Sequence, residues 1–184
     1  MSLAETLMSA WTKDVSSDYG KGLINSHGCL QAALYHSLRL RTSAQKIFVK
    51  PTLCLSGQDS EETRPDVVIC EGERVAAVVE LRFAPHRHPA YRLDIEKINR
   101  LGMRKDERHH IEIDPRTGNR AQRTYLIDEK MLLMYGVIAQ HNSSALSMDK
   151  LSEHLNRELS GRFYLLFGRV GARGTYEYGF AAYR

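Results

Sequence analysis

The feature that most constrains the fold is a pair of apolar runs within residues 64–83, separated only by the polar turn Glu71–Glu73. The first run reads Val-Val-Ile-Cys and the second reads Val-Ala-Ala-Val-Val, and short apolar runs bounded by turn residues are typical of buried β-strands. A turn this short joins two strands in antiparallel order. The sequence therefore predicts a β-hairpin with strands at residues 64–71 and 74–83.

Charged residues stand at the open end of this hairpin. Asp66 opens the first apolar run, and Glu80 and Arg82 close the second. Opposed residues of an antiparallel hairpin have a nearly constant index sum, which puts Asp66 almost opposite Glu80, with Cβ atoms roughly 5 Å apart. Arg82 leaves the strand on the same face as Glu80, because side chains alternate. Two carboxylates this close repel each other unless a cation compensates them.

Two kinds of cation would satisfy this cluster. Mg²⁺ prefers oxygen ligands and is usually bound by one or two carboxylates together with waters and phosphate. Alternatively, Arg82 could form a partly buried salt bridge with Asp66 or Glu80 that only closes the hairpin. The local residues leave both interpretations open.

The remaining periodicity predicts a single domain of 184 residues, with a mixed α/β sheet flanked by helices. The segment 113–122 is expected to be a loop. The segment 129–140 is expected to be a strand, although a helix of that length is not excluded. The expected helices cover residues 2–16, 26–40, 91–105 and 148–159, and the expected strands cover residues 46–55, 64–71, 74–83, 129–140, 161–170 and 174–183.

Composition narrows the class of protein. Apolar residues make up 42 % of the chain and charged residues 26 %, as in ordinary soluble domains. No apolar run approaches the roughly 20 residues that span a bilayer, and the N-terminal residues do not form a signal-peptide pattern. We therefore expect a cytoplasmic protein without a membrane segment. The net charge of +4, with cations dense in residues 82–92 and 98–110, is compatible with a nucleic-acid partner.

The order Pro-Asp, turn, apolar run and Glu-Leu-Arg resembles the motif of the PD-(D/E)xK nuclease superfamily. Asp66 and Glu80 are 14 residues apart, which lies within the usual spacing of that motif. The resemblance covers roughly residues 25–105, since one predicted helix precedes the strands and another follows them. It implies a restriction-endonuclease-like fold over residues 1–184, with a helical extension at residues 1–20 and the motif-bearing core at residues 25–105.

The resemblance also implies roles for individual residues. Asp66 and Glu80 would bind Mg²⁺ or Mn²⁺, with the carbonyl oxygen of Leu81 as a further ligand. The usual lysine of the motif falls at Arg82, which can hold a phosphate oxygen but stays protonated and cannot act as a base. A lysine supplied from another position could replace it, and Lys97 on the next predicted helix is the candidate.

The first core helix departs from the family pattern. Members often carry a glutamate there, whereas this helix offers His27 and Gln31. Gln31 could contact a metal-bound water, but the site would then hold less negative charge. Both this departure and Arg82 leave catalysis itself an open question.

The function implied by the resemblance is that of a Mg²⁺-dependent DNA endonuclease or exonuclease, in defence or repair, which could work as a homodimer to cut both strands. The alternative is a catalytically degenerate member that binds nucleic acid or a protein partner. Lys97 distinguishes them: a side chain directed at Asp66 and Glu80 favours the enzyme, and a solvent-facing one favours the binding protein.

Phosphate contacts are expected from four arginines that follow the hairpin. A solvated loop and a solvated helix face are the competing interpretations of the same charges. Such contacts would supply affinity rather than sequence preference. The four residues are Arg87, Arg92, Arg100 and Arg104.

Overall fold

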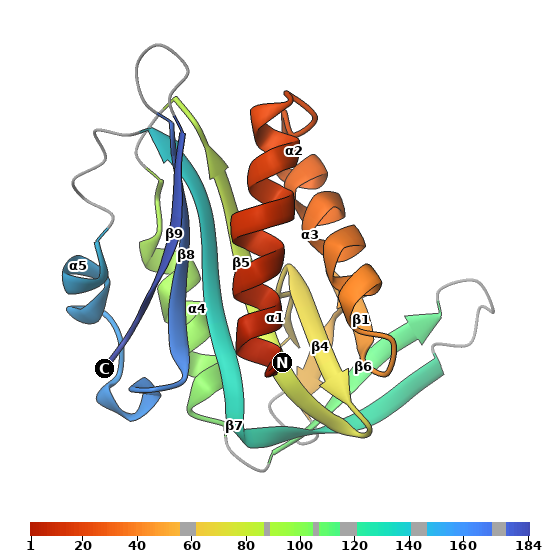
Figure 1. The fold of residues 1–184 in the computed structure, drawn as a ribbon. Helices are drawn as coiled ribbons and strands as arrows, with labels where there is room; N and C mark the ends of the chain where they lie inside the picture. Colours follow the sequence, from red (N-terminus) through yellow and green to blue (C-terminus); the bar gives the residue numbers. More distant parts are fainter. Residues whose placement is uncertain (56–61, 87–88, 105–106, 115–120, 141–146, 171–175) are drawn as a thin grey trace.

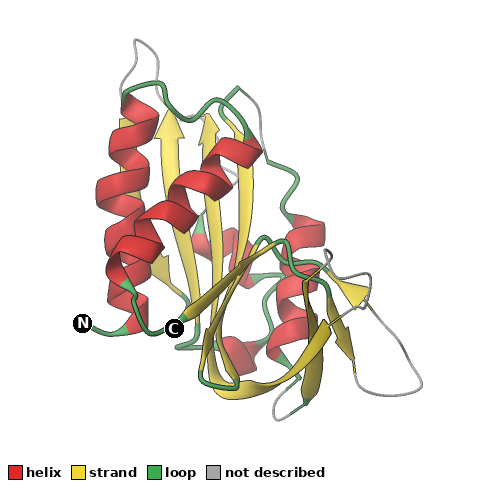
Figure 2. Ribbon diagram, turned by 90° about the vertical axis from the view of Figure 1, so that its right-hand side faces the viewer, coloured by secondary structure: helices red, strands yellow, loops and turns green. Residues whose placement is uncertain are grey.

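A twisted β-sheet runs through the molecule, and helices pack on both of its faces in the computed structural model (Figures 1 and 2). This arrangement confirms the predicted mixed α/β class with a sheet flanked by helices. The structure describes residues 1–55, 62–86, 89–104, 107–114, 121–140, 147–170 and 176–184.

The N-terminal helical segment is longer than the sequence predicts. Helix α1 (Leu3–Ser9), the π-helix η1 (Ala10–Val15) and helix α2 (Ser16–Gly20) follow one another without a break. Ser2 and Glu5 begin the segment with a capping box, in which each side chain accepts a hydrogen bond from the backbone N–H of the other. The expected helix at residues 2–16 is confirmed and continues to Gly20.

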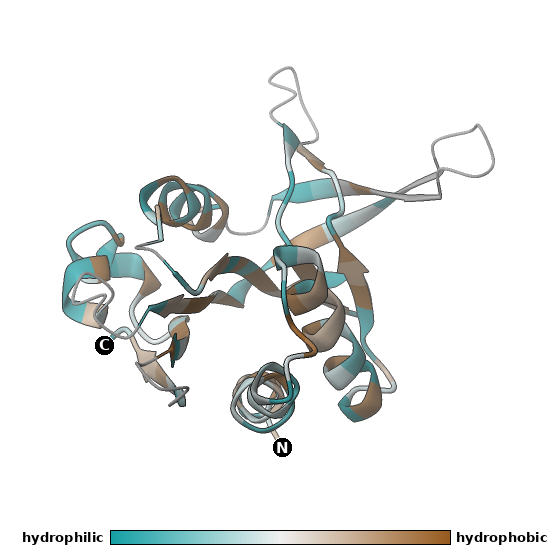
Figure 3. Cartoon of the chain, turned by 90° about the horizontal axis from the view of Figure 1, so that it is seen from above, coloured by the Kyte–Doolittle hydropathy of each residue, from teal (hydrophilic) through white to brown (hydrophobic). Residues whose placement is uncertain are grey.

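Two further helices frame the predicted hairpin. Helix α3 (His27–Arg41) matches the prediction for residues 26–40, and the Ser26 hydroxyl caps it by accepting the N–H of Cys29. Helix α4 (Arg92–Gly102) is shorter at both ends than the predicted helix at residues 91–105. Because α3 and α4 lie on opposite faces of the sheet, the hairpin is covered from both sides (Figure 3).

The described residues form nine strands in one sheet. Strands β1, β4 and β5 lie side by side in antiparallel order, and β7 runs parallel to both β5 and β8. Strand β7 is long enough to pair with β6 through its first half and with β8 through its second half. The strands are β1 (Lys46–Val49), β2 (Leu53–Leu55), β3 (Glu62–Thr63), β4 (Val67–Glu71), β5 (Arg74–Ala84), β6 (Arg108–Asp114), β7 (Ala121–Gln140), β8 (Phe163–Val170) and β9 (Tyr176–Ala182).

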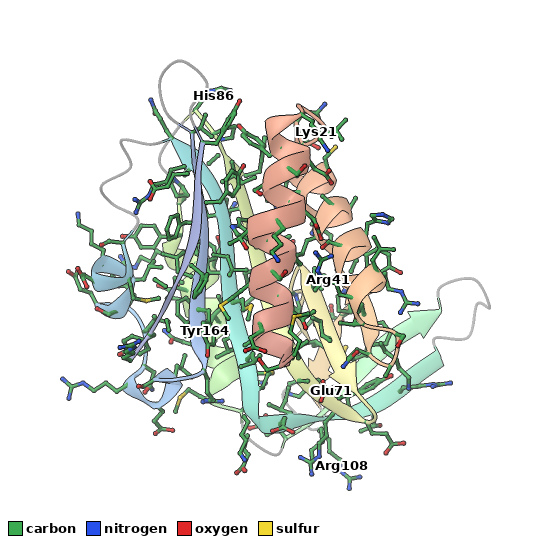
Figure 4. All side chains as sticks on the ribbon, viewed as in Figure 1. Lys21, Arg41, Glu71, His86, Arg108 and Tyr164 are labelled. Atoms are coloured by element: carbon green, nitrogen blue, oxygen red, sulfur yellow. The ribbon has the colours of Figure 1, made fainter. Side chains whose placement is uncertain are left out.

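The hairpin formed by β4 and β5 has the predicted register. Val67 pairs with Val79 as the last pair before the open end, so the next positions along the two strands are Asp66 and Glu80. A β-bulge between Ile69 and Cys70 shifts the index sum by one near the turn. Glu71 marks the turn in Figure 4, and the two acids therefore lie well away from it, where β4 begins.

Two apolar cores bury the two faces of the hairpin. Val68 and Val78 face α4, while Val67, Val79 and Leu81 face the N-terminal helices. Alternation along the strands explains this division, because successive side chains point to opposite faces. None of the described helices is long and apolar enough to cross a membrane.

A close approach at Gly136 ties the N-terminal helix to the strand that carries the site. Gly136 on β7 pairs with Leu81, and a Cβ there would lie 2.7 Å from the Leu81 Cδ2 atom and 3.0 Å from the Trp11 ring. The absent side chain leaves room for Trp11, whose indole N–H donates to the Phe167 carbonyl at 3.1 Å. Trp11 is thereby fully buried against the sheet.

Three predicted elements differ in the structure. The expected strand at residues 46–55 divides into β1 and β2, which pair with different strands, because Lys50 has a φ of 48° and Pro51 has no N–H to donate. A loop was expected at residues 113–122, but its two ends belong to strands β6 and β7. The centre of that segment lies outside the described residues. The expected helix at residues 148–159 divides into α5 (Met148–Ser152) and a 3₁₀ turn, which Asn156 caps.

Candidate active site

Asp66 is held at the start of β4 by hydrogen bonds from two directions. Its Oδ1 atom accepts from Gln31 Nε2 at 2.5 Å and from His27 Nε2 at 3.0 Å. Its Oδ2 atom accepts from the backbone N–H of Leu81 at 2.7 Å. His27 and Gln31 lie one turn apart on α3, so that helix presents both donors to one carboxylate. Gln31 is therefore at the site, as predicted, but it binds the acid directly.

Glu80 faces the opposite helix. Lys97 on α4 donates to Glu80 Oε2 at 2.9 Å and also to the carbonyl oxygen of Arg64 at 3.1 Å. The Glu80 side chain is 3 % exposed, and its Oε1 atom accepts no hydrogen bond from any described residue. A buried carboxylate oxygen without a donor is costly. Lys97 is directed at the acids of the hairpin, which is the arrangement that favoured the enzyme.

Arg82 is engaged by a carboxylate that the motif does not include. Its Nη2 atom donates to Asp94 Oδ1 at 2.7 Å and to Oδ2 at 2.6 Å, and its Nε atom donates to Oδ2 at 3.0 Å. The hydroxyl of Tyr135 on β7 also donates to Asp94 Oδ2, at 3.3 Å. The predicted structural alternative named the right cation, Arg82, but the wrong acid: the partner is Asp94 on α4.

The pKa values of the two acids of the hairpin are shifted in opposite directions. Burial by itself raises the pKa of Asp66, but the hydrogen bonds from His27 and the Leu81 N–H outweigh burial and hold it below its usual range. Burial raises the pKa of Glu80 to about 8, although Lys97 opposes the shift. The negative charges of Asp66 and Asp94 push the pKa of Glu80 in the same direction as burial.

The site offers few protein ligands to a hard divalent ion. Among the described residues, no three His, Cys, Asp or Glu side chains are grouped to hold a metal. Mg²⁺ needs no such group, since it is usually held by one or two carboxylates with waters and phosphate. Glu80 Oε1 accepts no hydrogen bond from the described residues, whereas a metal at Asp66 would share an oxygen with the donors already bound there. The Leu81 carbonyl faces the same edge as the Leu81 N–H that binds Asp66, because both groups of a strand residue point to one neighbour.

Of the four arginines expected to contact phosphate, the structure describes three, and two of these three line one pocket. Arg87 is outside the described residues. Arg92 is largely exposed and forms an ion pair with Glu96 one turn along α4, at 3.3 Å. Arg100 and Arg104 line a pocket together with Lys97, so these two are connected to the site.

The residues that sequence reasoning missed as parts of the site are Asp94 and Tyr135. Asp94 precedes Lys97 by three residues, and that spacing puts both on one helix face. The signal for Asp94 was therefore present in the helix beside the predicted cluster. Tyr135 lies in the middle of an apolar run, where nothing marks its hydroxyl as a partner of Asp94.

Comparison of the chain with protein-family models, with curated proteins and with solved structures gives no match. The geometry of the site is therefore the basis for proposing a function.

Proposed function

We propose that the protein is a divalent-metal-dependent DNA nuclease of the PD-(D/E)xK type that hydrolyses phosphodiester bonds. The observation that carries the proposal is Glu80: a buried carboxylate with one oxygen bound to Lys97 and the other left without a donor among the described residues, at the same hairpin end as Asp66. Acidic and basic groups with strongly shifted pKa values are common at catalytic sites. The order of α3, the antiparallel strands β1, β4 and β5, and α4 also supports the family resemblance.

Each residue of the site has a distinct part in the proposed reaction. Asp66 and Glu80, with the Leu81 carbonyl, would hold Mg²⁺ or Mn²⁺. Such an ion, when bound, polarises the phosphate and lowers the pKa of a bound water. A water oxygen forms a bond to phosphorus, the bond from phosphorus to the leaving oxygen breaks, and a proton passes to that oxygen. His27 and Gln31 orient Asp66, since hydrogen-bonding partners fix the orientation of metal-binding carboxylates.

The role of the single lysine in the usual motif is shared here between Lys97 and Arg82. Lys97 supplies the ammonium group at Glu80, where it can hold a phosphate oxygen or orient the attacking water. Arg82 is joined to both oxygens of Asp94, and this pair fixes α4 against β5. The substitution of arginine at the motif position is then compatible with catalysis, because the positioned lysine comes from α4.

The proposal extends to DNA as substrate, a cytoplasmic location, a role in defence or repair, and a second copy of the chain for cutting both strands. The alternative, a degenerate member that binds nucleic acid or a protein partner without cutting, is favoured by one observation. Both oxygens of Asp66 accept hydrogen bonds from the protein, so this acid is satisfied without a metal. Binding of DNA without cleavage in Mg²⁺ or Mn²⁺ would support that alternative.

The test is cleavage of supercoiled plasmid, linear duplex and single-stranded DNA in Mg²⁺ and Mn²⁺, together with calorimetric titration of both metals. We expect Glu80→Gln and Asp66→Asn to lose the heat of metal binding. Cleavage should fall by more than the roughly 10- to 100-fold typical of residues that only orient a ligand. Glu96→Gln is the matched control, because Glu96 lies exposed on α4 and pairs with Arg92. A wild-type protein that neither binds metal nor cuts any of the three substrates would overturn the proposal.

A further inference from the structure

Strand β9 is an edge of the sheet with little protection. In the part of the chain that the structure describes, three strands pair with one neighbour only: β1, β3 and β9. Each leaves a row of backbone N–H and C=O groups unpaired, and proteins usually protect such edges with charges, proline or short strands. Strand β3 has two residues, and β1 has four and begins with Lys46. Strand β9 has seven residues and a single charge, Glu177, so it is the least protected of the three.

The side chains of β9 are mostly apolar and accessible. None of its seven residues is buried, whereas four of the eight residues of β8 are. Tyr176 and Phe180 are 47 % and 50 % exposed, and their spacing puts them on one face of the strand. The charge of Glu177 is balanced within the chain by Arg169 at 3.4 Å. Helices α1 and α5 lie on either side of β8 and β9 in Figure 1. An accessible apolar edge of this length favours pairing with another strand.

The hydrogen bonds of Tyr183 show which backbone groups of β9 point outward. The Tyr183 N–H donates to the Phe163 carbonyl at 3.0 Å, and its carbonyl accepts from the Gly161 N–H at 2.8 Å. Both groups therefore point to the side of β8. Successive residues of an antiparallel strand alternate in this direction, and β9 pairs with β8 without a bulge. The even-numbered residues of β9 thus direct their N–H and C=O groups to the open edge.

Strand β9 is complementary to a second copy of itself. In an antiparallel pair centred on Gly179, Tyr178 lies opposite Phe180 of the second copy, and even-numbered residues face each other throughout. The outward N–H and C=O groups of both strands then form hydrogen bonds. Glu177 lies opposite Ala181, so no like charges are directly opposed. Pairing about a two-fold axis covers the β9 edges of both copies at once, which closes the assembly at two chains.

We infer that β9 is the interface of a homodimer, in which the β9 strands of two copies pair in antiparallel order and join the two sheets into one. The inference names the surface that the second copy in the proposed function would bind, and it rests on that part of the proposal. Strands β7 and β8 separate β9 from β5, a distance of three strand spacings or roughly 14 Å. The interface therefore does not cover Asp66 or Glu80.

Charge substitutions at Phe180 test the interface directly. Sedimentation velocity over a range of protein concentrations would be measured for wild type, Phe180→Lys and Phe180→Glu. The two copies of position 180 lie diagonally across the two-fold axis, with Cβ atoms roughly 7–8 Å apart, so like charges there repel each other. Wild type should form a dimer, and each charged variant alone should dimerise about tenfold more weakly. An equal mixture of the two variants should recover the dimer, because lysine and glutamate then attract each other.

Leu40→Lys is the matched control, because Leu40 is 72 % exposed on α3 and the substitution is of the same kind. It should leave the dimer unchanged, and Phe180→Leu, which stays apolar, should retain most of it. Hydrogen exchange of the wild-type protein gives a readout that needs no variant. The outward amides of Tyr178, Phe180 and Ala182 should exchange more slowly as protein concentration rises, because the dimer protects them.

Three results would overturn the interface. The first is a wild-type protein that is monomeric at every concentration, and the second is a dimer that both charged variants retain. The third is an assembly that keeps growing with concentration, because each β9 edge can pair with only one copy. Cleavage plays no part in these measurements, so a failure of the nuclease proposal and a failure of the interface would be observed separately.

Discussion

The two carboxylates at the open end of the β4–β5 hairpin are held in different ways. On the side of α3, Asp66 accepts three hydrogen bonds from His27, Gln31 and the Leu81 N–H, and its pKa is lowered. On the side of α4, Glu80 has one donor, Lys97, and its pKa is raised to about 8. Neighbouring acids whose environments push their pKa values apart commonly have separate roles in catalysis.

The protein alone completes the α3 side of the site but not the α4 side. The α3 side is satisfied by the protein itself, so it fixes Asp66 in place. The α4 side leaves Glu80 Oε1 without a donor from the described residues, so an external cation or a proton must compensate it. Substitutions on the α4 side should therefore change activity and pH dependence most.

The largest effect is expected from Lys97→Met, which removes the ammonium group at Glu80 and retains much of the apolar stem. Cleavage should fall by about 10²- to 10³-fold, the range for removing one fixed donor that stabilises developing negative charge. Arg82→Lys, which keeps a cation on Asp94, should cut within about tenfold of wild type. Single-turnover rates with excess enzyme would measure both, and equal losses in the two variants would contradict the division of roles between these cations.

The pH dependence of stability should follow Glu80. Its folded-state pKa is raised from 4.5 to about 8, so the folded protein binds the proton more tightly than the unfolded chain. The stabilisation is present below pH 4.5 and is lost as pH rises towards 8, by about 1.4 kcal/mol for each pH unit of that window. Glu80→Gln should therefore gain stability relative to wild type as pH rises.

Urea unfolding of metal-free protein at pH 5, 6.5 and 8 would test this dependence. Glu96→Gln, an exposed change on the same helix, should follow the wild-type curve at every pH. If the curves of wild type and Glu80→Gln stay parallel, Glu80 does not carry the raised pKa.

Asp94→Asn should lower the free energy of unfolding, because it leaves Arg82 without its carboxylate. This effect should be smaller than the change with pH expected from Glu80. Removing one partner of a fully buried pair costs about 3–5 kcal/mol, but Arg82 is 36 % exposed, so about 1–3 kcal/mol is expected. Because this pair holds α4 against β5, Lys97 should lose its fixed position and cleavage should fall as well. Denaturant unfolding and a cleavage assay on the same samples would show whether both properties change together.

The smallest effect is expected from Tyr135→Phe, which deletes one hydrogen bond to Asp94 and keeps the buried ring. The loss of stability should be about 1 kcal/mol, and Arg82 should still hold Asp94. Cleavage within twofold of wild type would place Tyr135 in a supporting role. A loss as large as that of Asp94→Asn would instead mean that Tyr135 is essential for holding the acid.

Several features followed from the sequence because they depend on neighbours along the chain. The turn at Glu71–Glu73 set the register of the hairpin, so residue numbers alone placed Asp66 and Glu80 at the same end. Alternation put Arg82 on the face of Glu80. Helical spacing identified α3 and α4, and the family resemblance then indicated Gln31 and Lys97 on them as candidates near the acids.

The partners of these charged groups depend on how distant elements pack. The packing of α4 on β5 pairs Arg82 with Asp94 and Lys97 with Glu80. From the sequence alone, either cation could have paired with either carboxylate. The division of β1 from β2 and the length of β7 depend on pairings between distant strands, which local propensity does not encode. Local sequence was enough to predict a hairpin with charges at one end. Burial between two helices then decided which carboxylate is satisfied, because the penalty for an unpaired oxygen depends on what surrounds it.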